Sequence, residues 1–246
     1  MLKLPNRTTK PREVGLTCIT DTGLTINQTA NMLEDFGEYL DVAKLGIGTG
    51  FITGRLPEKL KLYRDAGVIC YFGGSLFEKY YHQNLFSEYI DYLDELGVDA
   101  IEISSGILDV SNDELANLVP DLTGRFTVFC EVGCKDAAAI MAPSQWIGEI
   151  NNFFDAGADY VITEGRDSGT AGIFRESGEL RTGLIQDISA LPNASRIIFE
   201  APTGSSQMYF INLIGPGVNL GNIKPSDIAT LEAQRVGLRY ETFFVE

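Results

Sequence analysis

Long apolar runs are absent from this 246-residue sequence. No stretch reaches the ~18 consecutive apolar residues that a membrane-spanning helix needs, and the beginning of the chain lacks the apolar core of a signal peptide. Positive charge is also scarce, because 19 Lys+Arg stand against 34 Asp+Glu and give a formal net charge of −15. This surplus of negative charge repels phosphate backbones and anionic lipids. We therefore expect neither a nucleic-acid partner nor a membrane partner.

Cysteine and histidine are too sparse for the sites they usually build. The four cysteines are Cys18, Cys70, Cys130 and Cys134, and none forms a CxxC pair. This usage favours a reduced cytoplasmic protein over a zinc site or a disulfide framework. His82 is the only histidine and is not at a predicted strand end, so a hydrolytic Ser-His or Cys-His arrangement has no support.

What the sequence does contain is a regular alternation of short β-branched runs and longer amphipathic stretches. The predicted strands are Val14–Thr20, Val42–Ile47, Val68–Phe72, Ala100–Ser104, Phe126–Val132, Tyr160–Glu164, Arg196–Glu200 and Val218–Gly221. The predicted helices are Thr25–Phe36, Pro57–Ala66, Leu85–Leu96, Asn112–Val119, Ser144–Asp155, Gly183–Leu191, Ser205–Leu213 and Pro225–Arg235.

Eight strand–helix units in about 250 residues predict an α/β protein, a closed (β/α)8 TIM barrel. An open doubly wound sheet has the same local alternation, but no GxGxxG motif opens the first helix. No low-complexity linker divides the chain, so we expect residues 1–246 to form a single barrel domain, with residues 1–12 as an N-terminal extension.

Charged residues gather where the predicted strands end, which is where the active site of a (β/α)8 barrel lies. Carboxylates follow or end several otherwise apolar runs, and buried carboxylates need a cation or hydrogen-bond donors. Magnesium would suit such oxygen ligands. The alternative is an internal salt-bridge network, for example a Glu102–Lys44 or a Glu131–Lys135 pair. The candidate metal ligands are Glu102, Glu131, Glu164 and Glu200, and the candidate catalytic cations are Lys44, Lys135 and Arg166.

Small and polar residues after the last three strands suggest a phosphate site. Barrels often hold phosphate on backbone N–H groups between the loops after strands seven and eight. Ordinary helix capping by Ser205 explains one of these loops equally well, and a glycine-rich turn with a surface arginine explains the loop at Arg166. The candidate substrate- and phosphate-binding residues are Ser168, Gly169, Gly204, Ser205, Asn219 and Asn222.

These strand-end segments resemble the phosphosulfolactate synthase family. The likeness extends in order from about residue 12 to about residue 243. The stretch Lys10–Thr17 also resembles plant heat-stress-associated relatives of that family. The segments are Lys44–Thr49, Gly73–Glu78, Ile101–Ser104, Glu131–Lys135, Glu164–Gly169, Phe199–Pro202, Val218–Asn222 and Glu232–Arg239.

The resemblance implies a (β/α)8 lyase that adds sulfite to phosphoenolpyruvate with the help of Mg²⁺ and forms 2-phospho-3-sulfolactate. It further implies a homo-oligomer, a small anionic substrate and a place in coenzyme M biosynthesis. By the same resemblance, Lys135 matches the family's proposed proton donor. Arg166 and Ser168 match its anion-binding loop, and Lys44 matches its lysine on strand two.

Two departures from the family pattern remove positive charge. Thr22 and Cys134 stand where the family carries lysines, and Ser105 replaces an aspartate after strand four. The alternatives are therefore a barrel that uses another nucleophile or another unsaturated acid, and a non-catalytic stress-related or binding protein of the same family.

Overall fold

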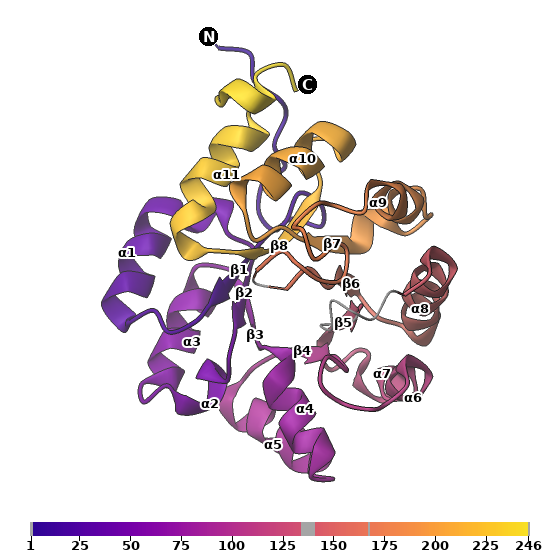
Figure 1. The fold of residues 1–246 in the computed structure, drawn as a ribbon. Coiled ribbons are helices and arrows are strands. Elements are labelled where there is room, and N and C mark those ends of the chain that lie inside the picture. The colour runs from indigo at the N-terminus through magenta and orange to yellow at the C-terminus, as the bar shows by residue number, and fades with distance from the viewer. Residues whose placement is uncertain (1, 134–140, 167, 246) are drawn as a thin grey trace.

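Eight parallel strands form the centre of the computed structural model, which describes residues 2–133, 141–166 and 168–245. Figure 1 shows the strands inside a ring of helices. The hydrogen-bonded order is β3-β2-β1-β8-β7-β6-β5-β4, and every pair is parallel. This arrangement confirms the predicted (β/α)8 barrel. The strands are β1 Thr17–Asp21, β2 Val42–Leu45, β3 Ile69–Phe72, β4 Ala100–Ile103, β5 Thr127–Val132, β6 Tyr160–Thr163, β7 Ile197–Glu200 and β8 Asn219–Ile223.

The barrel is nearly, but not fully, closed by backbone pairing. Strands β3 and β4 lie next to each other in Figure 1, yet no ladder joins them among the described residues. Side chains bridge this seam instead. The Gly74 N–H, just after β3, donates to Glu102 Oε1 of β4 at 2.5 Å.

Helices of very different length surround the strands. The α-helices are α1 Ile26–Phe36, α2 Thr49–Ile52, α3 Leu56–Asp65, α4 Gly74–His82, α5 Phe86–Leu96, α6 Asn112–Ala116, α7 Val119–Leu122, α8 Pro143–Ala156, α9 Thr182–Ser189, α10 Gly204–Ile214 and α11 Ile228–Arg235. The 3₁₀-helices are η1 Gly37–Tyr39, η2 Ala194–Arg196, η3 Pro225–Asp227 and η4 Tyr240–Thr242. None of the helices in the described ranges has the length and apolar character to cross a membrane.

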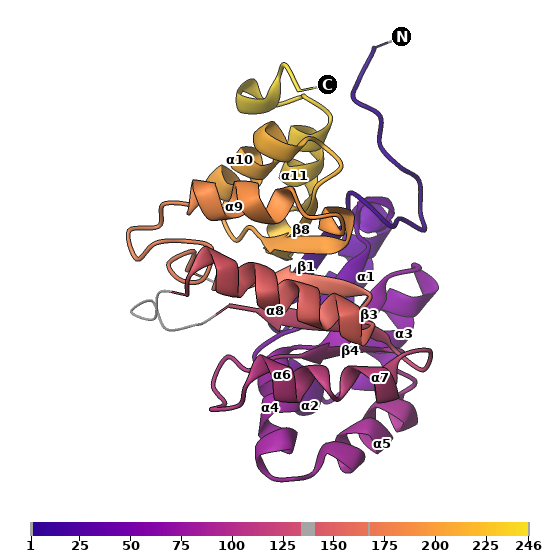
Figure 2. The ribbon, with the colours of Figure 1, turned by 90° about the vertical axis from the view of Figure 1, so that its right-hand side faces the viewer.

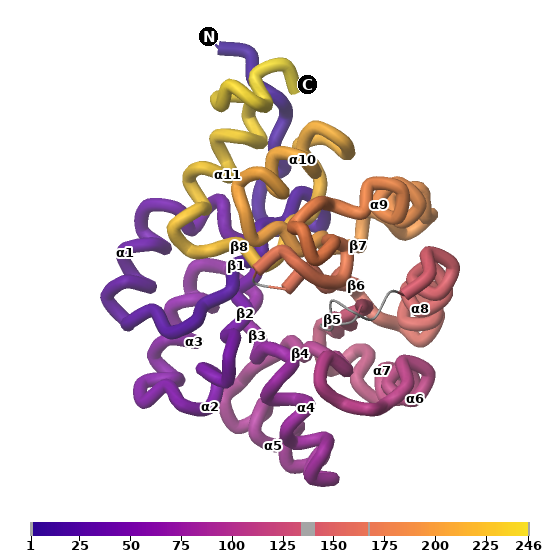
Figure 3. Tube along the Cα trace, viewed as in Figure 1, coloured from indigo at the N-terminus to yellow at the C-terminus, as the bar shows by residue number. Residues whose placement is uncertain are grey.

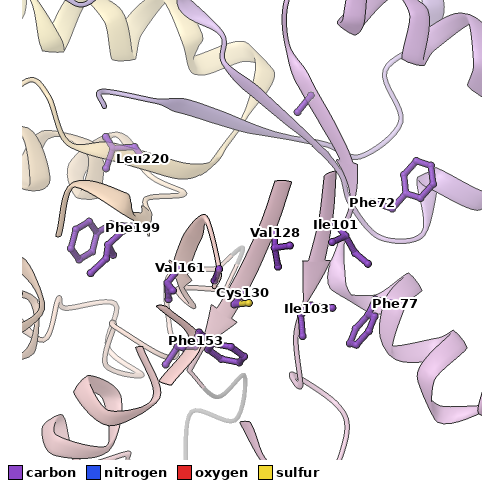
Figure 4. Close-up of a cluster of buried hydrophobic side chains, with 14 of the residues drawn as sticks. Phe72, Phe77, Ile101, Ile103, Val128, Cys130, Phe153, Val161, Phe199 and Leu220 are labelled. Carbon is purple, nitrogen blue, oxygen red and sulfur yellow. The ribbon is translucent and has the colours of Figure 1, made fainter. Parts of the chain in front are cut away.

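The apolar core has two layers. Between strands and helices, side chains such as Phe77 of α4 and Ile103 of β4 are fully buried and lie near each other in Figure 4. Inside the barrel, Tyr71 stacks on Phe129 with ring centroids 4.7 Å apart, and Phe129 stacks on Tyr160 at 5.3 Å. These rings fill the barrel interior, so polar groups can gather at the carboxyl ends of the strands, which we call the mouth.

The predicted N-terminal extension packs across the opposite end of the barrel (Figure 2). Arg7 pairs with Glu232 of α11 at 3.0 Å. The Lys10 ammonium donates to the carbonyls of Gly37, Leu40 and Ala66 at 2.6–3.0 Å, where helices end. A cation there complements the negative end of the helix dipole. The two chain ends lie on the same side of the molecule (Figure 3).

Candidate active site

A cavity of about 230 Å³ opens at the mouth of the barrel. Residues from the carboxyl ends of β1, β2, β5, β7 and β8, and from the loops after β2, β3, β4 and β6, line it. Within the described ranges, the cations of the lining are Lys44 and Arg166, and its carboxylates are Glu131, Glu164 and Glu200. The mouth is where barrel enzymes place their chemistry, because eight separate loops converge there.

Lys44 organises one side of this cavity. Its Nζ lies 2.9 Å from Glu102 Oε2 and 3.3 Å from Glu131 Oε2. Burial alone would lower the pKa of Lys44, but Glu102 and Glu131, with smaller contributions from Tyr71 and Glu200, raise it well above its usual value. Lys44 is therefore a permanent ammonium at the mouth. The Glu102–Lys44 pair expected as an alternative from the sequence is confirmed.

Glu102 lies outside the cavity lining and contacts residues that form it. Its side chain is fully buried. One carboxylate oxygen receives the Gly74 N–H and the other pairs with Lys44. These contacts place Glu102 in the salt-bridge network that fixes the start of α4 and the position of the lysine.

Glu164 and Glu200 form the opposite wall, next to Arg166. The Gly165 N–H donates to Glu200 Oε2 at 2.8 Å, and the Arg166 N–H donates to Glu164 Oε1 at 2.5 Å. Burial raises the pKa of Glu200 to about 7; Lys44 and the Gly165 N–H oppose this rise, whereas Glu131 and Glu102 add to it. Glu200 can therefore hold or release a proton near neutral pH.

Asp21, at the end of β1, has a structural environment that its position in the sequence does not reveal. Its Oδ2 accepts hydrogen bonds from Lys59 at 2.7 Å and Tyr63 at 2.9 Å, both on α3, and its Oδ1 receives the N–H groups of Gly23 and Leu24. These contacts hold the β1–α1 loop and α3 against the end of β1. The signal that could have identified this role is the buried Lys59 on an otherwise apolar helix face.

The structure brings some of the predicted phosphate-binding residues to the cavity and leaves others outside. Asn222 lines it and accepts a hydrogen bond from Thr20 at 3.1 Å. Asn219 does not, because β8 begins at this residue. Its side chain lies at the amino end of the barrel, bonded to the backbone of Leu16, Ser195 and Ile197.

The loops at Ser168 and Gly204 also lie outside the cavity lining. The hydroxyl of Ser168 bonds that of Thr170, and Gly169 takes a positive φ of 65° in the turn after Arg166. Gly204 and Ser205 are exposed in the first turn of α10, and Thr203 caps that helix, not Ser205. Lys135 and Cys134 fall outside the described residues, so the proposed role of Lys135 stays a prediction.

The candidate site residues chosen from the sequence include none from the loops after β2, β3 and β4, although these loops contribute to the lining. Gly46 and Ile47 follow β2, Gly73 to Ser75 open α4, and Ile107 follows β4. Ile47 and Asn222 both take positive φ values, 48° and 54°, as does Arg166 at 56°. Three of the four non-glycine residues found in this conformation among the described residues therefore line one cavity, which is typical of functional sites.

The predicted metal ligands do not form a carboxylate cage. Over the described ranges, no group of three or more His, Cys, Asp or Glu side chains is arranged to hold a metal ion. Glu102 and Glu131 instead converge on the Lys44 ammonium. Magnesium commonly uses only one or two carboxylates together with substrate oxygens and water. That mode is compatible with Glu131, Glu164 and Glu200, which line the cavity.

Fold and site together define a (β/α)8 barrel with a charged cavity at the position of a barrel active site. The family model described as "(2R)-phospho-3-sulfolactate synthase (ComA)" matches residues 5–241. The chain therefore belongs to the phosphosulfolactate synthase family, as its strand-end motifs indicated.

Named relatives span the whole chain. It is 41% identical to a phosphosulfolactate synthase of Bacillus subtilis, covering 99% of this chain and 98% of the relative. It is 38% identical to one of Methanocaldococcus jannaschii, covering 93% and 94%. The Arabidopsis thaliana protein HEAT-STRESS-ASSOCIATED 32 is 21% identical over 94% of this chain and 88% of its own length.

Solved structures support the fold alone. The YdjI aldolase of Escherichia coli K12 superposes with a TM-score of 0.56 at 12% identity, covering 90% of this chain and 80% of that one. At such low identity the likeness shows a shared barrel, not a shared reaction.

Proposed function

We propose that this protein catalyses the addition of sulfite to phosphoenolpyruvate to form 2-phospho-3-sulfolactate, a carbon–sulfur bond-forming lyase reaction. The observation that carries the proposal is the family membership over residues 5–241. The cavity supports it independently, because it is small and the part of its lining that the structure describes includes two cations, Lys44 and Arg166. Both reactants are small anions and need such partners.

The reaction builds up negative charge on the substrate, and cationic residues at the mouth can stabilise it. The sulfur lone pair of sulfite bonds to the terminal methylene carbon, and the electron pair of the double bond moves toward the substrate carboxylate as an enediolate. A fixed ammonium such as Lys44 stabilises that charge without reorganisation, since its neighbours already hold it in place. Arg166 can bind a carboxylate or a phosphate through two parallel hydrogen bonds.

A proton must then reach the central carbon. Lys135 is the donor that the family resemblance implies. Among the described residues, Glu200 is a second group suited to hold that proton, because its pKa is about 7 and it lines the cavity. Separate substitution of Lys135 and Glu200 distinguishes the two.

We also propose that the reaction requires Mg²⁺. Bound magnesium would neutralise the developing negative charge on the substrate oxygens. Glu131, Glu164 and, when it is ionised, Glu200 are the described side chains available to hold it, with Glu102 committed to Lys44 and Gly74.

Phosphorus NMR tests the proposal directly. The purified protein is incubated with phosphoenolpyruvate, sulfite and Mg²⁺, beside samples that lack sulfite or contain a chelator. We expect a new phosphoester resonance that needs both sulfite and Mg²⁺. A resonance that persists with the chelator would refute the magnesium requirement.

An unchanged phosphoenolpyruvate signal would refute the synthase assignment. A panel of other nucleophiles then tests a related addition reaction, and a thermal melt tests for a non-catalytic protein. A higher melting temperature with phosphoenolpyruvate and Mg²⁺ would indicate that the site still binds this ligand, whereas no such rise would favour a non-catalytic protein.

A further inference from the structure

Ile47 occupies a backbone conformation that its side chain disfavours. Its φ is 48°, in the left-handed region, where β-branched residues are genuine outliers. The turn Gly46–Thr49 imposes this conformation, since the Thr49 N–H donates to the Gly46 carbonyl at 3.0 Å. A glycine at position 47 would adopt the turn without strain.

Packing does not explain why an isoleucine stands there. The Ile47 side chain is 65% exposed, so it contributes little to the apolar core. It does line the mouth cavity. A strained residue that is neither buried nor required by its turn points to a function at that cavity.

Ile107 presents a second exposed isoleucine to the same cavity. It is 77% exposed, and the loop that carries it is anchored by Glu78, a side chain only 3% exposed. The Glu78 carboxylate accepts the Ile107 N–H at 2.9 Å, the Gly106 N–H at 3.1 Å and the Ser104 hydroxyl at 2.6 Å. The hydrogen bonds of a buried carboxylate thus fix the backbone of the loop that carries an exposed isoleucine.

The two isoleucines are the apolar side chains among the described residues of the cavity lining. They follow β2 and β4, whereas the lining carboxylates come from β5, β6 and β7. The two isoleucines therefore lie on the side of β2 and β4, which also carries Lys44 and which we call the apolar side, and the carboxylates lie on the side of β5, β6 and β7. A substrate with an unsaturated carbon between charged groups would place that carbon on the apolar side, away from the carboxylates.

We propose that Ile47 and Ile107 are specificity-determining residues that contact the unsaturated carbons of the acceptor and exclude water from the carbon that receives the nucleophile. This inference rests on the proposed function. It explains the strained backbone of Ile47 and the buried position of Glu78. The roles proposed for the charged groups of the site explain neither feature.

A surface for a second protein molecule is the competing explanation. Phe51 and Ile52 of α2 follow Ile47 in the sequence and are 63% and 72% exposed. Ile52 does not line the cavity, so it separates the two explanations. A docking surface would depend on Ile52 as much as on Ile47, whereas a substrate contact would depend on Ile47 alone.

The test compares Ile47→Gly, Ile47→Leu and Ile107→Ser with the matched control Ile52→Ser. For each variant, kcat and KM for phosphoenolpyruvate are measured at saturating sulfite, together with melting temperature and solution mass. Phosphorus NMR also follows 2-phosphoglycerate, the product expected if water adds to the same carbon in place of sulfite.

We expect Ile47→Gly to melt no lower than the wild type, because the strain is released, while its kcat/KM falls about tenfold or more. Ile107→Ser should lose activity similarly. Ile47→Leu should keep kcat/KM within about threefold, because it restores an apolar contact, and Ile52→Ser should match the wild type. The ratio of 2-phosphoglycerate to sulfonated product should rise in Ile47→Gly.

Two results would overturn the inference in an active wild-type protein. One is an Ile47→Gly variant with wild-type kcat/KM. The other is an equal loss in Ile52→Ser accompanied by a change in solution mass, which would support a docking surface. A wild-type protein that forms no product would overturn the proposed function itself, so the two failures are distinguishable.

Discussion

At the scale of single residues, the site depends on a lysine that compensates buried carboxylates. Lys44 contacts Glu102 and Glu131, and Glu102 is fully buried. Removing one partner of a buried ion pair is more costly than removing both, because an uncompensated charge remains in a low-dielectric site. Comparing a variant that lacks Lys44 alone with one that also lacks a carboxylate partner therefore distinguishes the effect of Lys44 on stability from its proposed effect on catalysis.

We expect Lys44→Met to lower the free energy of unfolding by about 3–5 kcal/mol. The double variant Lys44→Met/Glu102→Gln should recover part of that loss, because one of the two carboxylates that Lys44 compensates is then neutral, but it should remain inactive. Urea denaturation and the phosphorus NMR assay measure the two effects. A double variant that recovers activity would show that Lys44 acts only through the fold.

Glu200 makes stability depend on pH. Because the pKa of Glu200 is raised to about 7, chiefly by burial, the folded chain keeps this proton to higher pH than the unfolded chain. The folded state then binds more protons between about pH 4.5 and pH 7, so stability falls as pH rises through that window. Glu200→Gln should remove this fall.

Relative to the wild type, the Glu200→Gln variant should gain on the order of 2–3 kcal/mol between pH 4.5 and pH 8. Denaturation midpoints across this range provide the measurement, with Glu95→Gln, an exposed helix residue, as the control. Parallel pH profiles for wild type and Glu200→Gln would refute the raised pKa.

The residue scale also shows how far the sequence predicts the site. Lys44, Arg166 and three of the four glutamates that strand-end position selected line the cavity, and their roles stay predictions. Strand-end position did not separate Asn222 from Asn219, because the predicted strand Val218–Gly221 ends two residues before the observed β8, whose first residue is Asn219 and whose fourth is Asn222. Pairing with β1 and β7 decides where β8 ends, and no local pattern records those distant contacts.

At the scale of elements, the predicted strands lie within a few residues of those observed. Phe126–Val132, for example, is β5 Thr127–Val132. Helix α4 was missed, because Gly73 and Gly74 at its start are typical of a turn and glycine is a poor helix former. The predicted helix Asn112–Val119 is split into α6 and α7.

The glycine at the start of α4 has a steric cause. A Cβ on Gly74 would lie 2.1 Å from the Ser104 hydroxyl and 2.7 Å from Glu102 Oε1. Neither atom can move freely, since Ser104 bonds Glu78 and Glu102 pairs with Lys44. The close packing at the seam between β3 and β4 therefore requires glycine at position 74, although glycine is a poor helix former.

Gly74→Ala should consequently destabilise the protein by about 1–3 kcal/mol, as expected for overpacking. Gly183→Ala is the matched control, because Gly183 also lies in the first turn of a helix but nothing lies within 4 Å of its would-be Cβ. That control should be neutral or stabilising by up to about 1 kcal/mol. Equal effects in thermal melts would contradict the steric explanation.

At the scale of the whole molecule, the β3–β4 seam is the weak point of the barrel. Each of these strands has a backbone partner on one side only among the described residues. The side-chain contacts Gly74 to Glu102 and Ser104 to Glu78 join the two edges instead. Local opening needs less free energy where fewer backbone hydrogen bonds must break.

Hydrogen exchange should therefore be faster in β3 and β4 than in β1 and β8, which are paired on both sides. Glu78→Gln should accelerate exchange in β4 and its following loop, because a neutral amide holds the Ser104 hydroxyl and the two loop N–H groups more weakly. Exchange in β1 and β8 should not change. Mass spectrometry of peptides covering the four strands measures this, and uniform protection around the barrel would show that side chains close the seam as firmly as a ladder does.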